Sequence, residues 1–116
     1  MSEQHKNFID GIWQGAASGK TFKDINPAIN SDEIGEFPES GVEDVDDAVR
    51  AARKAFTTWS KMPPPERGNI LKNIGDILTA RKSEMAFEMT REMGKPFFET
   101  KGDVQEAIDT AYYAAS

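Results

Sequence analysis

The chain has 116 residues, no cysteine, one histidine and a formal net charge of −6, from 14 basic and 20 acidic residues. This length fits one domain at most, and the acidic balance disfavours nucleic acid and anionic membranes as partners. The lack of cysteine excludes disulfides, thiolate metal sites and a cysteine nucleophile within these residues.

The N-terminus predicts a polar, flexible tail over residues 1–6. The stretch MSEQHKNF lacks the apolar core of a signal peptide, which favours a cytoplasmic location. We expect His5 to be merely solvated in this tail, because one histidine without cysteines cannot build a transition-metal site.

Residues 7–38 predict strands and turns. Asp10-Gly11 stands between Phe8-Ile9 and Ile12-Trp13, and this is a strong hairpin signal because both turn positions need a positive φ. A second strand is expected over 21–25, ended by Asn26-Pro27, and a third over 34–37, closed by Pro38.

The apolar spacing then changes to alternating steps of three and four, which predicts an amphipathic helix. Ser40 or Gly41 is expected to cap this helix, with Glu43 completing a capping box with Ser40. The acidic pairs Glu43-Asp44 and Asp46-Asp47 are interpreted as a solvated helix start rather than a metal or acid/base site. The stripe consists of Val42, Val45, Val49, Ala52, Phe56 and Trp59.

Prolines 63–65 end this helix and open the next one, since proline is accepted in a first helical turn. Ser83 is expected to cap a shorter helix whose methionines pack in the core, and Gly94 to end it. A last helix should follow. The apolar stripes of these three helices comprise Ile70, Leu71, Ile74, Ile77 and Leu78, then Met85, Met89 and Met93, and finally Val104, Ala107, Ile108, Ala111, Tyr112 and Ala115.

These elements indicate an α+β fragment, a hairpin and short strands followed by amphipathic helices. Each element offers one apolar face, but the central sheet that such elements normally cover is missing. The last helix reaches Ser116 with its stripe still running. We therefore expect residues 7–116 to be the outer, truncated part of a larger domain.

The stretch GAASGKT, residues 15–21, resembles a phosphate-binding P-loop, which has four residues between its glycines and precedes a helix. Here only three residues separate Gly15 from Gly19, and Gln14 stands where the first glycine belongs. A strand, not a helix, is expected to follow this loop over 21–25, so the loop would lack the helix N-terminus whose amides bind a phosphate. We interpret it as a loop between strands, with nucleotide binding as the weaker alternative.

The remaining residues offer no catalytic constellation. The sequence contains no Gly-x-Gly-x-x-Gly, the fingerprint of a dinucleotide site. Tyr112 and Tyr113 are interpreted as packing residues, because nothing near them in the sequence activates either one.

Several segments, in order, resemble the N-terminal part of the aldehyde dehydrogenase superfamily: FIDGIW, SGKTFKDINPA, IGEFPES, VEDVDDAVRAARKAFTTWSKMPPPERGNIL and EMGKPFFETKGDVQEAIDTAYYAA. The resemblance runs from Asn7 to Ala115. The spelling GDVQEAID is similar to the branch related to aminoadipate semialdehyde dehydrogenase. The resemblance implies a part of an α/β, Rossmann-like cofactor domain.

The resemblance also implies NAD(P)-dependent oxidation of an aldehyde or semialdehyde to a carboxylic acid, by covalent catalysis on a cysteine with a glutamate base. The family's catalytic residues and its cofactor-binding strands lie downstream of the matched region. Catalytic and cofactor-binding residues are therefore expected to be absent from this chain, which alone should be inactive. The expected partners are the remainder of the enzyme chain and, at full length, further copies.

Some family members bind a monovalent cation, and this implies one site feature. The matching positions are the backbone carbonyl of Ile25 and the side chain of Glu92, with a third ligand beyond the chain. The alternative for Glu92 is an ordinary surface position on a helix. The alternative for the whole chain is a non-catalytic interaction or oligomerisation domain, whose interface would comprise Val45, Val49, Phe56, Ile70, Ile74 and Leu78.

Overall fold

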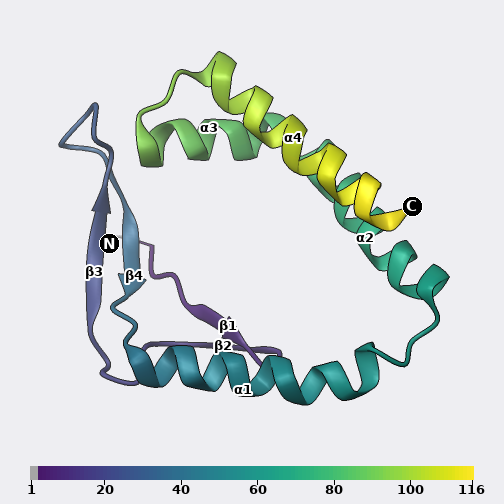
Figure 1. The fold of residues 1–116 in the computed structure, drawn as a ribbon. Helices are drawn as coiled ribbons and strands as arrows, with labels where there is room; N and C mark the ends of the chain where they lie inside the picture. The colour runs from purple at the N-terminus through teal and green to yellow at the C-terminus, as the bar shows by residue number, and fades with distance from the viewer. Residues whose placement is uncertain (1–2) are drawn as a thin grey trace. The chain divides into compact units, whose positions relative to one another are not determined.

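The computed structural model describes residues 3–116, and its elements can be followed along the chain in Figure 1. Residues 1 and 2 of the expected tail lie outside the described residues. Contacts divide the chain into two compact units, Met1–Lys61 and Met62–Ser116. Antiparallel hairpins and one helix form the first unit, and three helices form the second, which confirms the α+β class.

The first hairpin pairs β1 (Asn7–Ile9) with β2 (Ile12–Gln14). Asp10 and Gly11 form its turn with φ values of 52° and 78°, so both positions have the positive φ that the sequence predicts. Phe8 lies opposite Trp13, and the two rings lie 4.8 Å apart between centroids. Both side chains are largely exposed.

The second hairpin pairs β3 (Thr21–Ile25) with β4 (Glu33–Pro38), in antiparallel register with Phe22 opposite Phe37. β4 is one residue longer at each end than the sequence predicts. The turn between the strands is organised by Asn26, which is 5% exposed. Its Oδ1 accepts the Ala28 N–H at 2.9 Å, and its Nδ2 donates to a carboxylate oxygen of Asp32 at 3.0 Å.

The N-terminal residues pair with the free edge of β4. The His5 N–H donates to the Glu36 carbonyl at 2.8 Å, and the Glu36 N–H donates to the Glu3 carbonyl at 2.9 Å. The His5 ring stacks on Phe37 with centroids 4.4 Å apart. A Cβ at Gly35 would lie 2.8 Å from this ring, so the glycine makes room for it. The expectation that His5 is merely solvated is therefore wrong.

Helix α1 (Val42–Trp59) begins after Gly41, whose backbone is extended. The Gly41 N–H donates to Asp44 Oδ2 at 2.8 Å, so Asp44 rather than Glu43 supplies the capping carboxylate. The expected apolar stripe does lie along this helix, but the rest of the first unit leaves it uncovered. Its large members range from 38% exposed at Trp59 to 78% exposed at Val42.

The second unit consists of α2 (Pro64–Ala80), α3 (Lys82–Met93) and α4 (Phe97–Ala115). Proline starts α2 as expected, and Gly94 ends α3 with a φ of 76° while its N–H donates to the Thr90 carbonyl. The expected Ser83 cap is wrong. α2 ends at Ala80 and α3 begins at Lys82, and the cap residue between them, Arg81, makes no side-chain capping bond.

Helix α4 packs against α3 and α2 (Figure 1), and the small core of the second unit lies at this contact. Ala86, Val104 and Ile108 are fully buried there. Leu78, Met85 and Met89 pack against them, which confirms the core role of two methionines, while Met93 is half exposed. In the part of the chain that the structure describes, no helix combines the length and the apolar character needed to cross a membrane.

Candidate functional site

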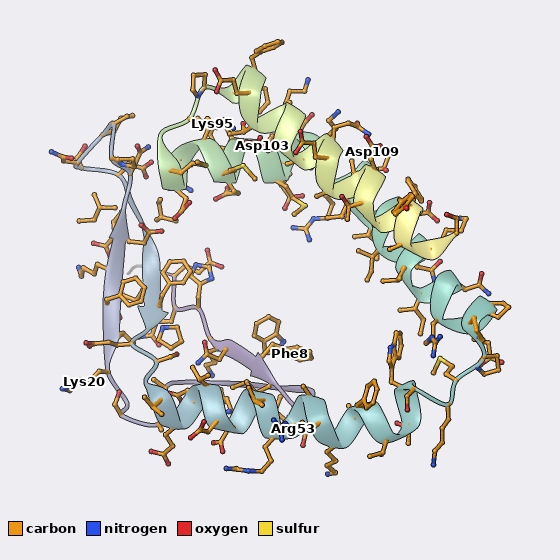
Figure 2. All side chains as sticks on the ribbon, in the orientation of Figure 1. Phe8, Lys20, Arg53, Lys95, Asp103 and Asp109 are labelled. Atoms are coloured by element: carbon orange, nitrogen blue, oxygen red, sulfur yellow. The ribbon has the colours of Figure 1, made fainter. Side chains whose placement is uncertain are left out.

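The loop GAASGKT joins β2 to β3 and leads into a strand, because Thr21 is the first residue of β3. Gly19 has a φ of 70°, and its N–H donates to the Ala16 carbonyl at 2.9 Å, which closes a tight turn. The Lys20 N–H donates to Ser18 Oγ at 3.2 Å, and Lys20 itself is exposed (Figure 2). The prediction of a loop between strands is confirmed.

An internal carboxylate binds one backbone amide of this loop. The Ala17 N–H donates to Asp44 Oδ1 at 2.8 Å, while the other oxygen accepts the Gly41 N–H. Asp44 is only 6% exposed. The hydrogen bonds from Gly41 and then Ala17 hold the pKa of Asp44 below its ordinary value of 3.8. The loop amide is thus satisfied by the protein itself.

The interpretation of Asp44 as part of a solvated helix start is therefore wrong. The sequence does carry a weak signal for its role, because Asp44 stands at the third helical position after Gly41, where a carboxylate can reach back to the cap. The contact with Ala17 has no such signal, since it joins residues 27 positions apart.

A hollow of about 270 Å³ lies between the β1–β2 hairpin and the start of α1, lined by Asn7, Phe8, Ile9, Ser40, Asp44, Val45 and Ala48. Its polar side chains are engaged with neighbours. Asn7 Nδ2 donates to Ser40 Oγ at 2.7 Å, and both Asp44 oxygens accept backbone bonds. The hollow is a packing seam and offers a ligand little polar recognition.

The two residues implied for a cation site lie in different units. Ile25 ends β3 in the first unit, and Glu92 lies exposed in the last turn of α3 in the second. The cation site therefore stays a prediction. Within residues 3–116, no three histidine or acidic side chains form a group that could hold a metal ion.

Polar groups in the second unit join its helices. Lys95 Nζ lies 2.6 Å from Asp103 Oδ2 where the chain enters α4, and Figure 2 shows the two side by side. The Asp103 carboxylate raises the pKa of Lys95. Thr100, fully buried, donates to the Ala86 carbonyl at 2.9 Å. These contacts tie α4 to α3 and to the loop before it.

Tyr112 belongs to a second polar network. Its hydroxyl donates to Asp76 Oδ1 at 2.7 Å, and Lys72 Nζ donates to Oδ2 at 2.8 Å. Lys72, and after it Tyr112, hold the pKa of Asp76 below its ordinary value. A carboxylate with a lowered pKa is a weak base, so the geometry supports the packing role expected for Tyr112 rather than proton transfer.

The match to known families covers most of the chain. The family model described as "Aldehyde dehydrogenase family" matches residues 13–116. The chain belongs to the aldehyde dehydrogenase family. This result confirms the resemblance deduced from the ordered sequence segments.

Three curated relatives show how much of such an enzyme the chain represents. It is 38% identical to an α-ketoglutarate semialdehyde dehydrogenase of Haloferax volcanii, covering 100% of this chain and 24% of that protein. It is 43% identical to a malonate-semialdehyde dehydrogenase of Bacillus pumilus, covering 95% of this chain and 22% of that protein. It is 37% identical to the pea (Pisum sativum) aldehyde dehydrogenase family 7 member A1, covering 93% and 21%.

Solved structures give the same proportion. The chain superimposes on an NAD-dependent aldehyde dehydrogenase from Sinorhizobium meliloti with a TM-score of 0.91 and 33% identity, over 99% of this chain and 23% of that one. An NADP-dependent enzyme of E. coli matches with a TM-score of 0.91 and 30% identity, over 97% of this chain and 23% of the E. coli chain. The chain thus spans about a quarter of the length of the proteins that it matches.

Proposed function

We propose that the chain is the N-terminal part of an NAD(P)-dependent aldehyde dehydrogenase that oxidises an aldehyde or semialdehyde to a carboxylic acid. One observation carries the proposal: 95% or more of the chain aligns with relatives that are about four times as long. The semialdehyde substrate class is supported by the names of the first two relatives. A cytoplasmic location and homo-oligomeric assembly of the full enzyme, without nucleic acid or membrane partners, belong to the same proposal.

In this proposal the described residues serve as scaffold. The family's covalent mechanism needs a cysteine thiolate, and these 116 residues contain no cysteine. The Ala17 amide of the glycine-rich loop already binds Asp44, so this group is engaged within the protein rather than free for a phosphate. The nucleophile, the general base and the groups that hold NAD(P) would therefore come from the rest of the enzyme.

A chimera tests the proposal directly. The matching N-terminal segment of the Bacillus pumilus relative is replaced by this chain, and aldehyde-dependent formation of NADH or NADPH is followed. We expect an active chimera, whereas this chain alone and the relative without its N-terminal segment should both be inactive. A soluble, folded chimera without turnover would count against the proposal.

The uncovered stripe of α1 favours a second candidate, a non-catalytic interaction or oligomerisation domain. Val42, Val45, Val49 and Phe56 are all more than 45% exposed. Burying one such side chain is worth roughly 1.5–3 kcal/mol, so an uncovered stripe favours association. Sedimentation of the isolated chain measures its oligomeric state, and the chimera assay measures activity. A defined oligomer of the isolated chain together with an inactive chimera would favour the interaction or oligomerisation domain.

A further inference from the structure

The turn of the β1–β2 hairpin contains the chain's one Asp-Gly pair, Asp10-Gly11. Both residues are exposed, and a Cβ built on Gly11 would meet nothing within 4 Å. The Asp10 carboxylate takes part in no hydrogen bond or ion pair with the described residues. Asp10 also has a φ of 52°, in the left-handed region that Asp and Asn adopt more readily than other residues with side chains.

We infer that Asp10 is a site of spontaneous isomerisation to isoaspartate. The Gly11 backbone nitrogen attacks Cγ of the protonated Asp10 carboxyl, a C–N bond forms, and a C–O bond breaks as water leaves. The product is a five-membered succinimide. Water then adds to one of the two succinimide carbonyls. When it adds to the main-chain carbonyl, the bond between the Asp10 carbonyl carbon and the Gly11 nitrogen breaks, and the chain then runs through Cβ and Cγ. One water is lost and one is gained, so the mass is unchanged and no oxidant or enzyme is required.

Gly11 makes this position different from every other aspartate. A following residue with a Cβ crowds the approach of its nitrogen to Cγ, and glycine has none. The other eight aspartates precede residues with side chains: they are Asp24, Asp32, Asp44, Asp46, Asp47, Asp76, Asp103 and Asp109. Several of them also have carboxylates bound by neighbours, such as Asp44, Asp76 and Asp103.

The folded turn sets the rate, because ring closure requires the backbone between Asp10 and Gly11 to rotate away from its native conformation. The strands beside the turn are only three residues long, and a two-stranded hairpin is marginally stable by itself. Local opening therefore gives access to the reactive conformation. The extra backbone carbon of isoaspartate then breaks the two-residue turn and the pairing of Phe8 with Trp13.

The test is to age the purified native chain near neutral pH and to map isoaspartate by enzymatic methylation and by fragmentation of its peptides. We expect isoaspartate at position 10 to accumulate several-fold faster than at any other aspartate, and urea to accelerate it. A Trp59→Phe background leaves Trp13 as the only indole, so its fluorescence should change in step with the modification. Gly11→Asn is the matched control, because asparagine tolerates a positive φ but restores a Cβ.

The inference requires this control to accumulate several-fold less isoaspartate at position 10. Two results would overturn it. One is an amount at position 10 in the native chain no greater than at Asp24. The other is equal accumulation in Gly11→Asn and in the parent chain. Neither result depends on catalytic activity, so these measurements test the isomerisation independently of the proposed function.

Discussion

Asp44 shows how one side chain fixes two segments of the first unit. Its oxygens accept N–H groups from Gly41 and from Ala17, so it joins the start of α1 to the loop before β3. Because these bonds favour the ionised carboxylate, the folded pKa is lower than the unfolded one. The resulting stability is complete above the ordinary pKa of 3.8 and is lost as the pH falls through the lowered folded value.

We therefore expect Asp44→Asn to lower the urea midpoint of the chain at neutral pH. The variant should also lose less stability than the parent as the pH falls below about 4, because it no longer takes up that proton on unfolding. Urea unfolding at a series of pH values measures both effects. Asp46→Asn is the matched control, since it removes an equal charge from an exposed neighbour. Equal behaviour of the two variants would contradict the role given to Asp44.

In the second unit, Thr100 joins two segments by side-chain hydrogen bonds, as Asp44 does in the first unit. It is fully buried, donates to the Ala86 carbonyl and lies 2.9 Å from Thr90 Oγ1. Thr100→Val keeps the shape but leaves these partners unsatisfied, so we expect a loss of about 1–3 kcal/mol in the free energy of unfolding. Thr100→Ser keeps the hydroxyl and should lose less. A greater loss in Thr100→Ser than in Thr100→Val would show that methyl packing, not hydrogen bonding, dominates here.

At the scale of elements, the contact between α2 and α4 depends on glycine. A Cβ at Gly75 would lie 2.7 Å from Tyr112 Cε1, and the ring is held by the bond from its hydroxyl to Asp76. Alanine gains about 1 kcal/mol over glycine in a helix interior, but overpacking costs roughly 1–3 kcal/mol. Because the added Cβ would collide with the Tyr112 ring, the overpacking cost should exceed the gain in helix propensity. Gly75→Ala should therefore lower the free energy of unfolding.

Thermal and urea unfolding of Gly75→Ala, Tyr112→Ala and the double variant check this expectation. Without the ring the added methyl has space, so Gly75→Ala should be neutral or stabilising in the Tyr112→Ala background. Gly102→Ala is the matched control in the interior of α4, where a Cβ meets nothing within 4 Å. It should gain about 0.5–1 kcal/mol. Additive effects of Gly75→Ala and Tyr112→Ala would argue against the proposed contact.

The elements themselves were largely predictable because their signals are local. Asp10-Gly11, the prolines at 63–65 and Gly94 each act within a few residues, and the hairpin turn, the start of α2 and the end of α3 lie where they predict. The contacts of His5 with Phe37 and of Asp44 with Ala17 join residues about 30 positions apart. No local pattern specifies such pairs, so the sequence left His5 and Asp44 as solvated groups. The cation positions Ile25 and Glu92 lie in different units and stay predictions.

At the scale of the whole molecule, the main feature is that each unit has apolar surface that its own residues do not cover. In the described first unit no apolar side chain reaches full burial, and the buried core of the second consists of Ala86, Val104 and Ile108. The relatives are about four times longer than this chain. An N-terminal segment of a larger enzyme accounts for both facts, because the remaining residues of that enzyme would pack on the open faces.

We expect the α1 stripe to behave differently in the isolated chain and in the chimera. In the isolated chain Phe56, which is 63% exposed, should bind a hydrophobic dye, and Phe56→Ser should weaken that binding with little loss of stability. In the chimera the same side chain should be buried, so Phe56→Ser should cost about 3 kcal/mol or more and lower the melting temperature. Arg53→Gln, on the same helix and exposed (Figure 2), should have little effect in either protein. An equally small effect of Phe56→Ser in both proteins would mean that the enzyme leaves α1 open, and would favour the interaction domain instead.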